Sequence, residues 1–98
     1  MVTVLETKRF RNWLNSIRDL TTRIRLARRL EKVQRGQFGD IKRLSEFLYE
    51  MREFFGVGWR MYYFQQESVT IVMLNGGCKK TQTTDIQLAK LMVKELRE

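Results

Sequence analysis

The chain has 98 residues, of which 43% are hydrophobic and 31% charged, so we expect one small domain and exclude wholesale disorder. No apolar run approaches the ~18 residues of a membrane-spanning helix, and no signal-peptide pattern opens the chain, so we expect a cytoplasmic protein without a membrane partner. A lone cysteine, Cys78, and the absence of histidine exclude an internal disulfide, histidine-based catalysis and most zinc sites, and we expect no metal and no cofactor.

The charge balance points to the class of partner. Lys and Arg number 19 against 11 Asp and Glu, which leaves a net charge of +8. A charge of this size on a small domain favours a polyanionic partner, either nucleic acid or an acidic protein.

The N-terminal third predicts a short strand and two helices. Residues 2–5 are an apolar run typical of an edge strand. Apolar residues then recur at i, i+3, i+4 and i+7, which predicts an amphipathic helix over residues 7–18. A second helix, capped by Asp19, Thr21 or Thr22, is predicted to run to about Gln34 and to end at Gly36. Its expected inward face consists of Leu20, Ile24, Ala27 and Leu30.

The expected outer face of the second helix is strongly basic. It carries Arg25, Arg28, Arg29 and Lys32. One interpretation is a solvated helix face. The other is a surface that follows the phosphates of RNA, or a platform for an acidic partner. We favour the second interpretation, because four cations on one face exceed what solubility requires.

Three extended runs with Gly-containing or polar turns form the centre of the predicted fold. They span residues 47–55, 59–65 and 69–74. Aromatic and β-branched residues alternate with polar ones along these runs, and the link between the first two is Gly56-Val57-Gly58. This pattern predicts an antiparallel meander.

One face of the predicted hairpin gathers charged residues. Period-two alternation places four side chains there: Glu50, Arg52, Arg60 and Tyr62. A hairpin folded about Val57 sets Arg52 opposite Tyr62 and diagonal to Arg60, about 7–8 Å away. Two guanidiniums this close repel each other. They are either solvated strand arginines balanced by nearby glutamates, or a pair that holds an anion between them.

The region after the meander predicts a loop and a last helix. Two glycines precede two lysines within residues 75–82, in a loop that is either flexible or built for close backbone approach. The last helix is predicted to bury Ile86, Ala89, Met92, Val93 and Leu96.

The order of the elements, (β)ααβββα, predicts an α+β fold. It consists of a small antiparallel sheet of three or four strands, packed with two N-terminal helices and a C-terminal helix. The chain is long enough for a single core. We expect this core to contain Trp13, Ile17, Met51, Met61 and Ile71.

Three stretches of the chain resemble one known family. They read RGQFGDIKRL, LYEMREFFGVGWRMYY and LNGGCKKTQTTDIQLAKLM, and the resemblance covers about residues 10–92. The sequence resembles the RelE/ParE superfamily of type II toxins, in particular the branch of addiction module killer proteins related to HigB. This resemblance implies a single RelE-like domain over residues 1–98.

The resemblance also implies an activity and partners. It implies a metal-independent endoribonuclease (an mRNA interferase) that cuts mRNA on the translating ribosome and thereby inhibits translation. It further implies a tightly bound cognate antitoxin, which is a small helix-turn-helix or acidic protein. The expected partners are therefore this antitoxin, mRNA and the ribosome.

Family positions carry over at three residues. Arg60 matches the arginine after the turn aromatic, Arg52 the basic position on the preceding strand, and Lys79 the basic position of the Gly-Gly loop. Cys78 and Lys80 depart from the loop's common G-G-D-K-S pattern. A family aromatic beyond this loop has no clear counterpart in the chain.

The implied reaction requires a base, stabilisation of charge on the phosphorane, and an acid. Arg52 and Arg60 would clamp the scissile phosphate. Glu50 is the candidate base, Lys79 the candidate acid, and Tyr62 would stack a base or hold a hydroxyl. The other candidates for RNA binding are Lys80, Arg25, Arg28, Arg29 and Lys32.

Two alternative functions remain open. A ParE-like gyrase inhibitor would share the fold and the charge but would need no nuclease site. A non-catalytic nucleic-acid-binding module would need only the basic helix. The presence of Arg52 together with Arg60 favours the nuclease.

Overall fold

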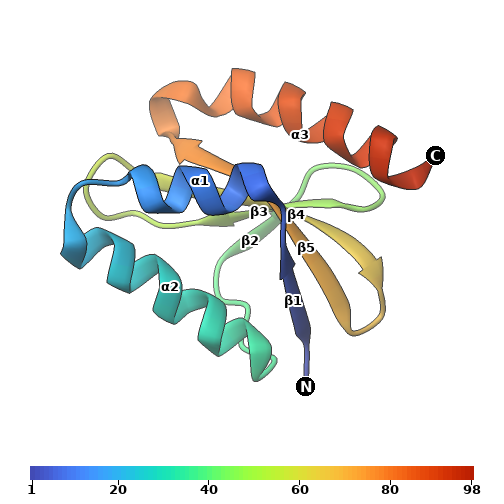
Figure 1. Cartoon of the computed structure of the whole chain (residues 1–98), viewed down its shortest axis with the longest axis horizontal. Helices are drawn as coiled ribbons and strands as arrows, with labels where there is room; N and C mark the ends of the chain where they lie inside the picture. Colours follow the sequence, from blue (N-terminus) through green and yellow to red (C-terminus); the bar gives the residue numbers. More distant parts are fainter.

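Five strands form one sheet in the computed structural model of the chain, which describes residues 1–98 (Figure 1). The strands are β1 (Thr3–Glu6), β2 (Ile41–Arg43), β3 (Leu48–Arg52), β4 (Trp59–Glu67) and β5 (Thr70–Cys78). Their order across the sheet is β1-β5-β4-β3-β2. β1 runs parallel to β5, whereas the other neighbouring pairs are antiparallel. The sheet is therefore mixed.

The α+β class is confirmed, but the sheet differs from the prediction in strand number and direction. The prediction of three or four antiparallel strands is wrong, because β2 is a further strand and β1 pairs in parallel. All three residues of β2 are exposed. An exposed strand has no alternating pattern of apolar residues, so β2 leaves no signal in the sequence. The run at residues 2–5 does form an edge strand, as expected.

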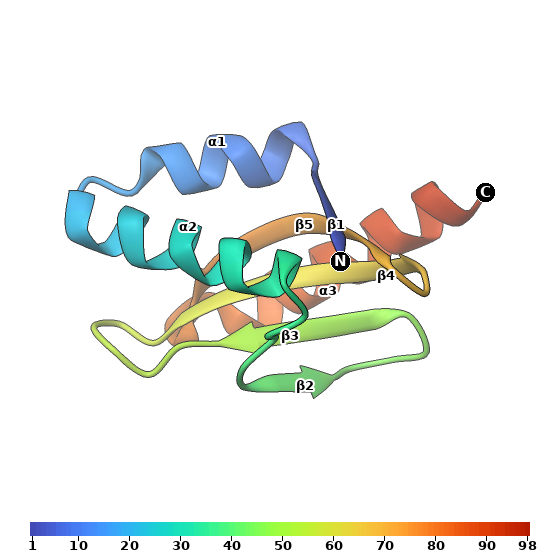
Figure 2. The same ribbon diagram turned by 90° about the horizontal axis from the view of Figure 1, so that it is seen from below.

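Helices cover both faces of this sheet (Figure 2). α1 (Lys8–Ser16) and α2 (Leu20–Gln34) lie on one face. α3 (Gln82–Arg97) lies on the other face and follows a 3-10 turn, Lys79–Thr81. None of the three helices combines the length and the apolar composition that crossing a membrane requires.

The sheet therefore separates two apolar clusters, where the sequence predicts one. The larger cluster, under α1 and α2, contains Phe10, Ile17, Leu26, Leu30, Val33, Met51, Met61, Tyr63, Ile71 and Met73. The smaller cluster, under α3, contains Leu48, Tyr62, Phe64, Val72, Leu74 and Ala89. The five residues predicted to share a core do so, since Trp13 packs against the larger cluster. Successive residues of β4 face opposite sides of the sheet, so one strand contributes to both clusters.

α2 is rotated relative to its predicted orientation. Leu20, Ile24 and Ala27 are exposed, and the helix instead buries Leu26 and Val33. Both sets follow the same spacing, because Leu26, Leu30 and Val33 also stand at i, i+4 and i+7. Periodicity alone therefore does not show which of the two stripes is buried. The structure buries Leu26, Leu30 and Val33, which lie in the middle and toward the C-terminal end of α2.

β5 extends through residues 75–78, which the sequence predicts as a loop. Gly76, in this part of β5, lies directly against the ring of Trp13. A Cβ atom on Gly76 would stand 2.4 Å from that ring, which is closer than any non-bonded contact allows. The glycine therefore lets α1 pack onto the end of the strand.

We predict that Gly76→Ala destabilises the fold by about 1–3 kcal/mol, because the added methyl group displaces the Trp13 ring. Urea unfolding followed by circular dichroism measures the change. In a Trp13→Leu background the same substitution should cost clearly less. Equal costs in the two backgrounds would show that the contact with Trp13 is not the cause.

Candidate functional site

The β3–β4 hairpin places Arg52 directly opposite Arg60 and Glu50 directly opposite Tyr62. The predicted register is wrong by two residues, because the hairpin folds about Gly56 rather than Val57. Gly56 has a φ of +57°, a conformation that glycine adopts without strain. The predicted common face is correct. The two arginines are nevertheless closer than predicted, since directly opposed residues have Cβ atoms about 4.5–5.5 Å apart.

This face of the hairpin is covered rather than exposed. Glu50 and Tyr62 are fully buried and Arg60 is 5% exposed, whereas Arg52 is half-buried. The interpretation of both residues as solvated strand arginines is therefore wrong for Arg60, whereas Arg52 is partly exposed. The cause is α3, which packs on this side of the sheet.

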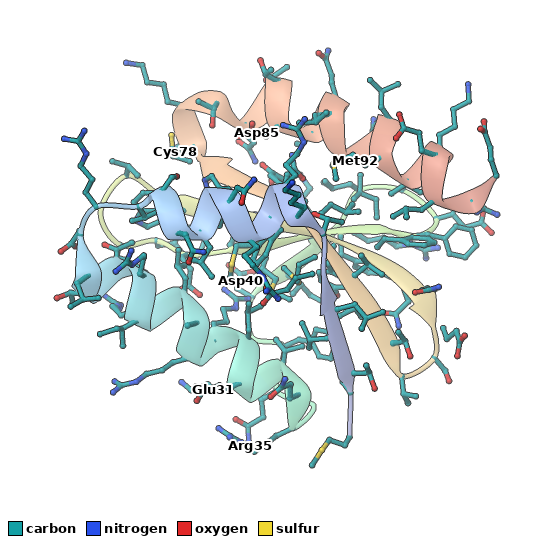
Figure 3. The ribbon with its side chains drawn as sticks, viewed as in Figure 1. Glu31, Arg35, Asp40, Cys78, Asp85 and Met92 are labelled. Atoms are coloured by element: carbon teal, nitrogen blue, oxygen red, sulfur yellow. The ribbon has the colours of Figure 1, made fainter.

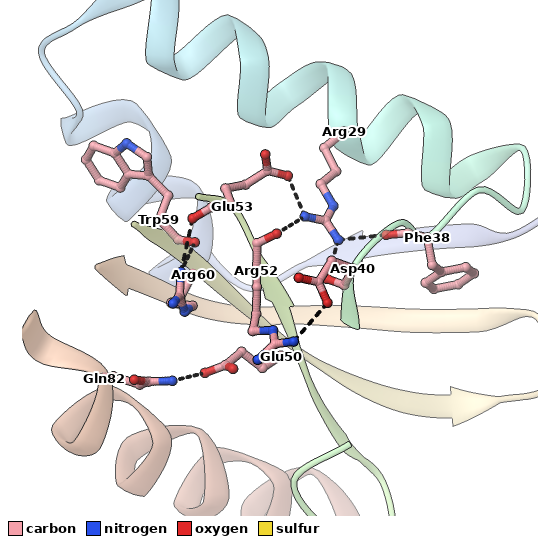
Figure 4. A network of polar contacts seen from close by, with 9 residues as sticks. All are labelled: Arg29, Phe38, Asp40, Glu50, Arg52, Glu53, Trp59, Arg60 and Gln82. Carbon is pink, nitrogen blue, oxygen red and sulfur yellow. Dashed lines mark hydrogen bonds and ion pairs between the residues drawn. The ribbon is translucent and has the colours of Figure 1, made fainter. Parts of the chain in front are cut away.

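Each charged side chain of the hairpin has a different partner (Figure 4). Arg52 donates from Nη2 to Asp40 Oδ1 over 3.1 Å. Arg60 donates from Nη1 to two backbone carbonyls of the hairpin, each at 3.1 Å. Glu50 accepts a 2.8 Å hydrogen bond at Oε2 from the side-chain amide of Gln82, at the start of α3. Glu50 therefore forms no ion pair with either arginine.

Five buried side-chain atoms have no hydrogen-bond partner within the chain, and all five belong to this region. They are Glu50 Oε1, Arg52 Nε, Arg60 Nε, Tyr62 OH and Asn75 Oδ1. The residues are cross-strand neighbours, because Tyr62 stands between Glu50 on β3 and Asn75 on β5. Buried polar groups are nearly always satisfied in native proteins, and clustered exceptions accompany function. The cluster marks this face as the candidate site.

The hydroxyl of Tyr62 stays protonated well into the alkaline range. Burial of the side chain raises the pKa of Tyr62, and the carboxylates of Glu50 and Asp85 raise it further. A neutral phenol donates one hydrogen bond and accepts others. At neutral pH, Tyr62 is therefore a hydrogen-bonding group and not a base.

The 3-10 turn brings Lys79 beside the hairpin. Gly58 separates the two, since a Cβ atom there would lie 3.2 Å from Lys79 Cβ and 3.5 Å from Arg60 Nη1. Both lysines of the turn, Lys79 and Lys80, are exposed. Cys78, at the end of β5, and Asp85, in the first turn of α3, lie on either side of this 3-10 turn (Figure 3).

Phe54 is a residue of this site that the sequence analysis missed. It lies in the hairpin turn and is 72% exposed. Its ring centroid is 5.7 Å from the guanidinium carbon of Arg52 and 5.6 Å from that of Arg60. Two consecutive aromatic residues next to a glycine-containing turn were the available signal, because successive residues of an extended segment face opposite sides and only one of the two rings, Phe55, packs against the core.

Arg29 is a structural residue and does not belong to an exposed basic face, so that prediction is wrong. Its side chain is buried beneath α2 and forms an ion pair with Glu53. It also donates to the backbone carbonyls of Arg52 at 2.5 Å, Phe38 at 2.8 Å and Asp40 at 2.6 Å. This guanidinium joins α2 to the end of β3 and to the segment before β2.

The other three cations of the predicted basic face are exposed, as expected. Arg25, Arg28 and Lys32 line a groove of about 520 Å³ on the side of the sheet opposite α3. Arg52 and Phe54 also line this groove. The predicted RNA-binding residues therefore divide between two surfaces, and Arg52 lies at the junction. No three His, Cys, Asp or Glu side chains are grouped in a way that could hold a metal ion.

The fold and site define a basic α+β protein with an arginine pair on a covered sheet face. No protein-family model matches the chain. The chain is 36% identical over 95 residues to an uncharacterized protein from Haemophilus influenzae, and the alignment covers 97% of this chain and 96% of that protein. The chain belongs to the same family as this Haemophilus protein.

We predict that Arg29→Met destabilises the fold by about 3–5 kcal/mol, because it leaves a half-buried carboxylate and three carbonyls without their donor. The same substitution at its exposed neighbour, Arg28→Met, should change stability by no more than about 0.5 kcal/mol. Urea unfolding of both variants checks the difference. Similar stabilities would mean that the Arg29 network contributes little to the fold.

We also predict that stability falls at alkaline pH because of Tyr62. The unfolded tyrosine ionises at about pH 10. The folded residue has a raised pKa and keeps its proton, so its contribution is complete below pH 10 and is lost as the pH rises above it. Tyr62→Phe should remove up to about 1.4 kcal/mol per pH unit of this loss. Parallel stability curves for the two proteins above pH 10 would contradict this assignment.

Proposed function

We propose that the protein is the toxin of a type II toxin–antitoxin system and acts in the cytoplasm as an mRNA endoribonuclease. In this proposal it is a RelE-like member of the RelE/ParE superfamily, in the branch related to HigB. The observation that carries the proposal is the direct opposition of Arg52 and Arg60 beside a cluster of unpartnered buried polar atoms. The motif resemblance and the net charge of +8 support it.

The arginine pair supports a phosphate clamp. Two guanidiniums at directly opposed positions repel each other. An anion placed between them would attract both and so make their proximity favourable. Both arginines have a buried Nε–H without a partner, so each retains donor capacity toward an anion. Charge-assisted bonds of this kind stabilise the extra negative charge of a phosphorane.

The acid and base roles follow from position. Lys79 is exposed and lies beside Arg60 across Gly58, so we propose it as the general acid for the departing 5′-oxygen. Glu50 has one unpartnered carboxylate oxygen, Oε1, and we propose it as the general base. Glu50 is completely buried on the side of the sheet that α3 covers, so the substrate must displace the start of α3, where Gln82 binds the carboxylate, to reach it. The neutral hydroxyl of Tyr62 would hold the reacting hydroxyl group.

The proposed partners are the translating ribosome with its mRNA, and an antitoxin. A surface with a net charge of +8 attracts an acidic protein rapidly, and salt slows the association. The antitoxin would neutralise the toxin by covering the arginine pair.

We predict that Arg52→Ala lowers mRNA cleavage by about 100- to 1,000-fold, because it removes one preorganised donor from a charged transition state. Arg11→Ala is the matched control. Arg11, like Arg52, pairs with one carboxylate, but it lies on α1 and outside the candidate site. It should cleave at the wild-type rate. Primer extension on a reporter mRNA in a translating extract, with and without ribosome stalling, measures the cleavage.

Thermal melting of both variants controls for folding. If Arg52→Ala cleaves like the wild type, the phosphate clamp is refuted. If induced expression stops thymidine incorporation before methionine incorporation, a gyrase inhibitor replaces the nuclease as the function.

A further inference from the structure

We infer that the groove beside α2 binds the phosphate chain of single-stranded RNA and that Phe54 stacks a base where this groove meets Arg52. The inference rests on the proposed function and extends it. It gives the path that the RNA strand follows on one side of the arginine pair, and it adds a residue that recognises unpaired bases.

The first observation is the charge of the groove. Arg25, Arg28 and Lys32 line it, and none of them has a carboxylate within ion-pair distance. The groove also contains two acidic residues, but Asp40 is paired with Arg52, and Glu53 with the buried Arg29. The cations are thus left uncompensated. Glu31, the only acidic residue of α2, does not line the groove and lies near Arg35 (Figure 3).

The second observation is the spacing of these cations. Arg25, Arg28 and Lys32 stand at i, i+3 and i+7, which places them on one face of α2. They extend over about 10 Å along the helix axis. A nucleic-acid strand carries more than one phosphate over such a length. Arg25 is held in place by the ring of Phe55, whose centroid is 3.6 Å from its guanidinium carbon.

The third observation is the exposed ring of Phe54, which lines the groove together with Arg52. Phe54 lies beside the guanidiniums of both Arg52 and Arg60, yet most of its surface faces solvent. If a base stacked on the Phe54 ring, the phosphates of that nucleotide would lie near the two positively charged guanidiniums and be attracted to them. An unpaired base offers a free face for stacking, whereas the bases of a duplex do not.

The same three observations favour RNA over an acidic peptide. A peptide carboxylate would pair with the cations of α2 but would leave the aromatic ring without a specific partner. A single RNA strand uses both features, because stacking and phosphate contacts alternate along it. Arg52 belongs to the groove and to the arginine pair, so the two surfaces are continuous.

The test measures binding of a short fluorescein-labelled 2′-O-methyl RNA of mixed sequence by fluorescence anisotropy at several salt concentrations. Methylation of the 2′-oxygen prevents cleavage by the proposed mechanism. The proteins compared are the wild type, Phe54→Ala, Phe54→Trp, Arg28→Ala and the control Lys90→Ala. Lys90 is an exposed cation on α3, on the opposite side of the sheet.

The two kinds of contact predict different signatures. Loss of one stacked base in Phe54→Ala should weaken binding by about 5- to 150-fold without changing its salt dependence. Loss of one phosphate contact in Arg28→Ala should lower the slope of log K against log salt by about 0.7. Phe54→Trp should bind at least as tightly as the wild type, and Lys90→Ala should match it. The annealed duplex should bind without dependence on Phe54.

Three results would overturn the inference. One is wild-type affinity of Phe54→Ala for the single strand, and another is a salt slope of Arg28→Ala equal to that of Lys90→Ala. The third is displacement of the RNA by a polyglutamate peptide at a matched concentration of negative charge, which would assign the groove to an acidic protein. Thermal melting confirms that each variant is folded.

The outcome is separable from that of the proposed nuclease. If the wild type binds single strands as described but cleaves no translated mRNA, the nuclease proposal fails and the groove assignment stands. If Arg52-dependent cleavage occurs while binding is indifferent to Phe54 and Arg28, the groove assignment fails and the nuclease proposal stands.

Discussion

The buried guanidinium of Arg29 is the interaction on which the surrounding structure depends. It lies beneath α2 and binds three backbone carbonyls, at the end of β3 and in the segment that leads to β2, together with the carboxylate of Glu53. Backbone groups in irregular segments have no helix or strand to satisfy them, and leaving them unpaired in a buried position costs free energy. One planar cation with five donors satisfies several of them at once. The same contact fixes the rotation of α2 and therefore the direction in which its exposed cations point.

The β3–β4 hairpin next to this network contains several charged and polar groups whose positions destabilise the fold. Two arginines stand directly opposite each other, a glutamate is fully buried without an ion pair, and four buried polar atoms of the hairpin have no partner. A fold selected only for stability would replace such groups with apolar ones of similar shape, because buried unpaired groups destabilise it. The larger apolar cluster on the other face of the sheet is well packed and offsets this strain. The proposed anion site would explain why the arrangement persists.

The geometry also links the two basic surfaces of the molecule. α3 covers one face of the sheet and α2 the other, so side chains on the two faces are normally kept apart (Figure 2). Arg52 and Phe54 lie at the end of β3 and in the turn that follows it, where neither helix covers the sheet. They therefore border both the arginine pair and the groove along α2. In the proposed function, a flexible RNA strand would pass from one surface to the other at this edge.

By itself, the sequence determined the helices, the three central strands and the common face of Glu50, Arg52, Arg60 and Tyr62, because period-two and period-3.6 patterns are local properties of the chain. It did not determine the rotation of α2, since Leu20-Ile24-Ala27 and Leu26-Leu30-Val33 have the same spacing and only packing and the Arg29 network distinguish them. It did not reveal β2, whose residues are all exposed, nor the close packing of Gly76 against the ring of Trp13, which are far apart in the sequence. The sequence showed which face of the sheet Arg52 and Arg60 occupy, but it did not show whether that face is buried. Alternation along a strand says which side a residue faces, and only the tertiary position of α3 decided that this side is buried.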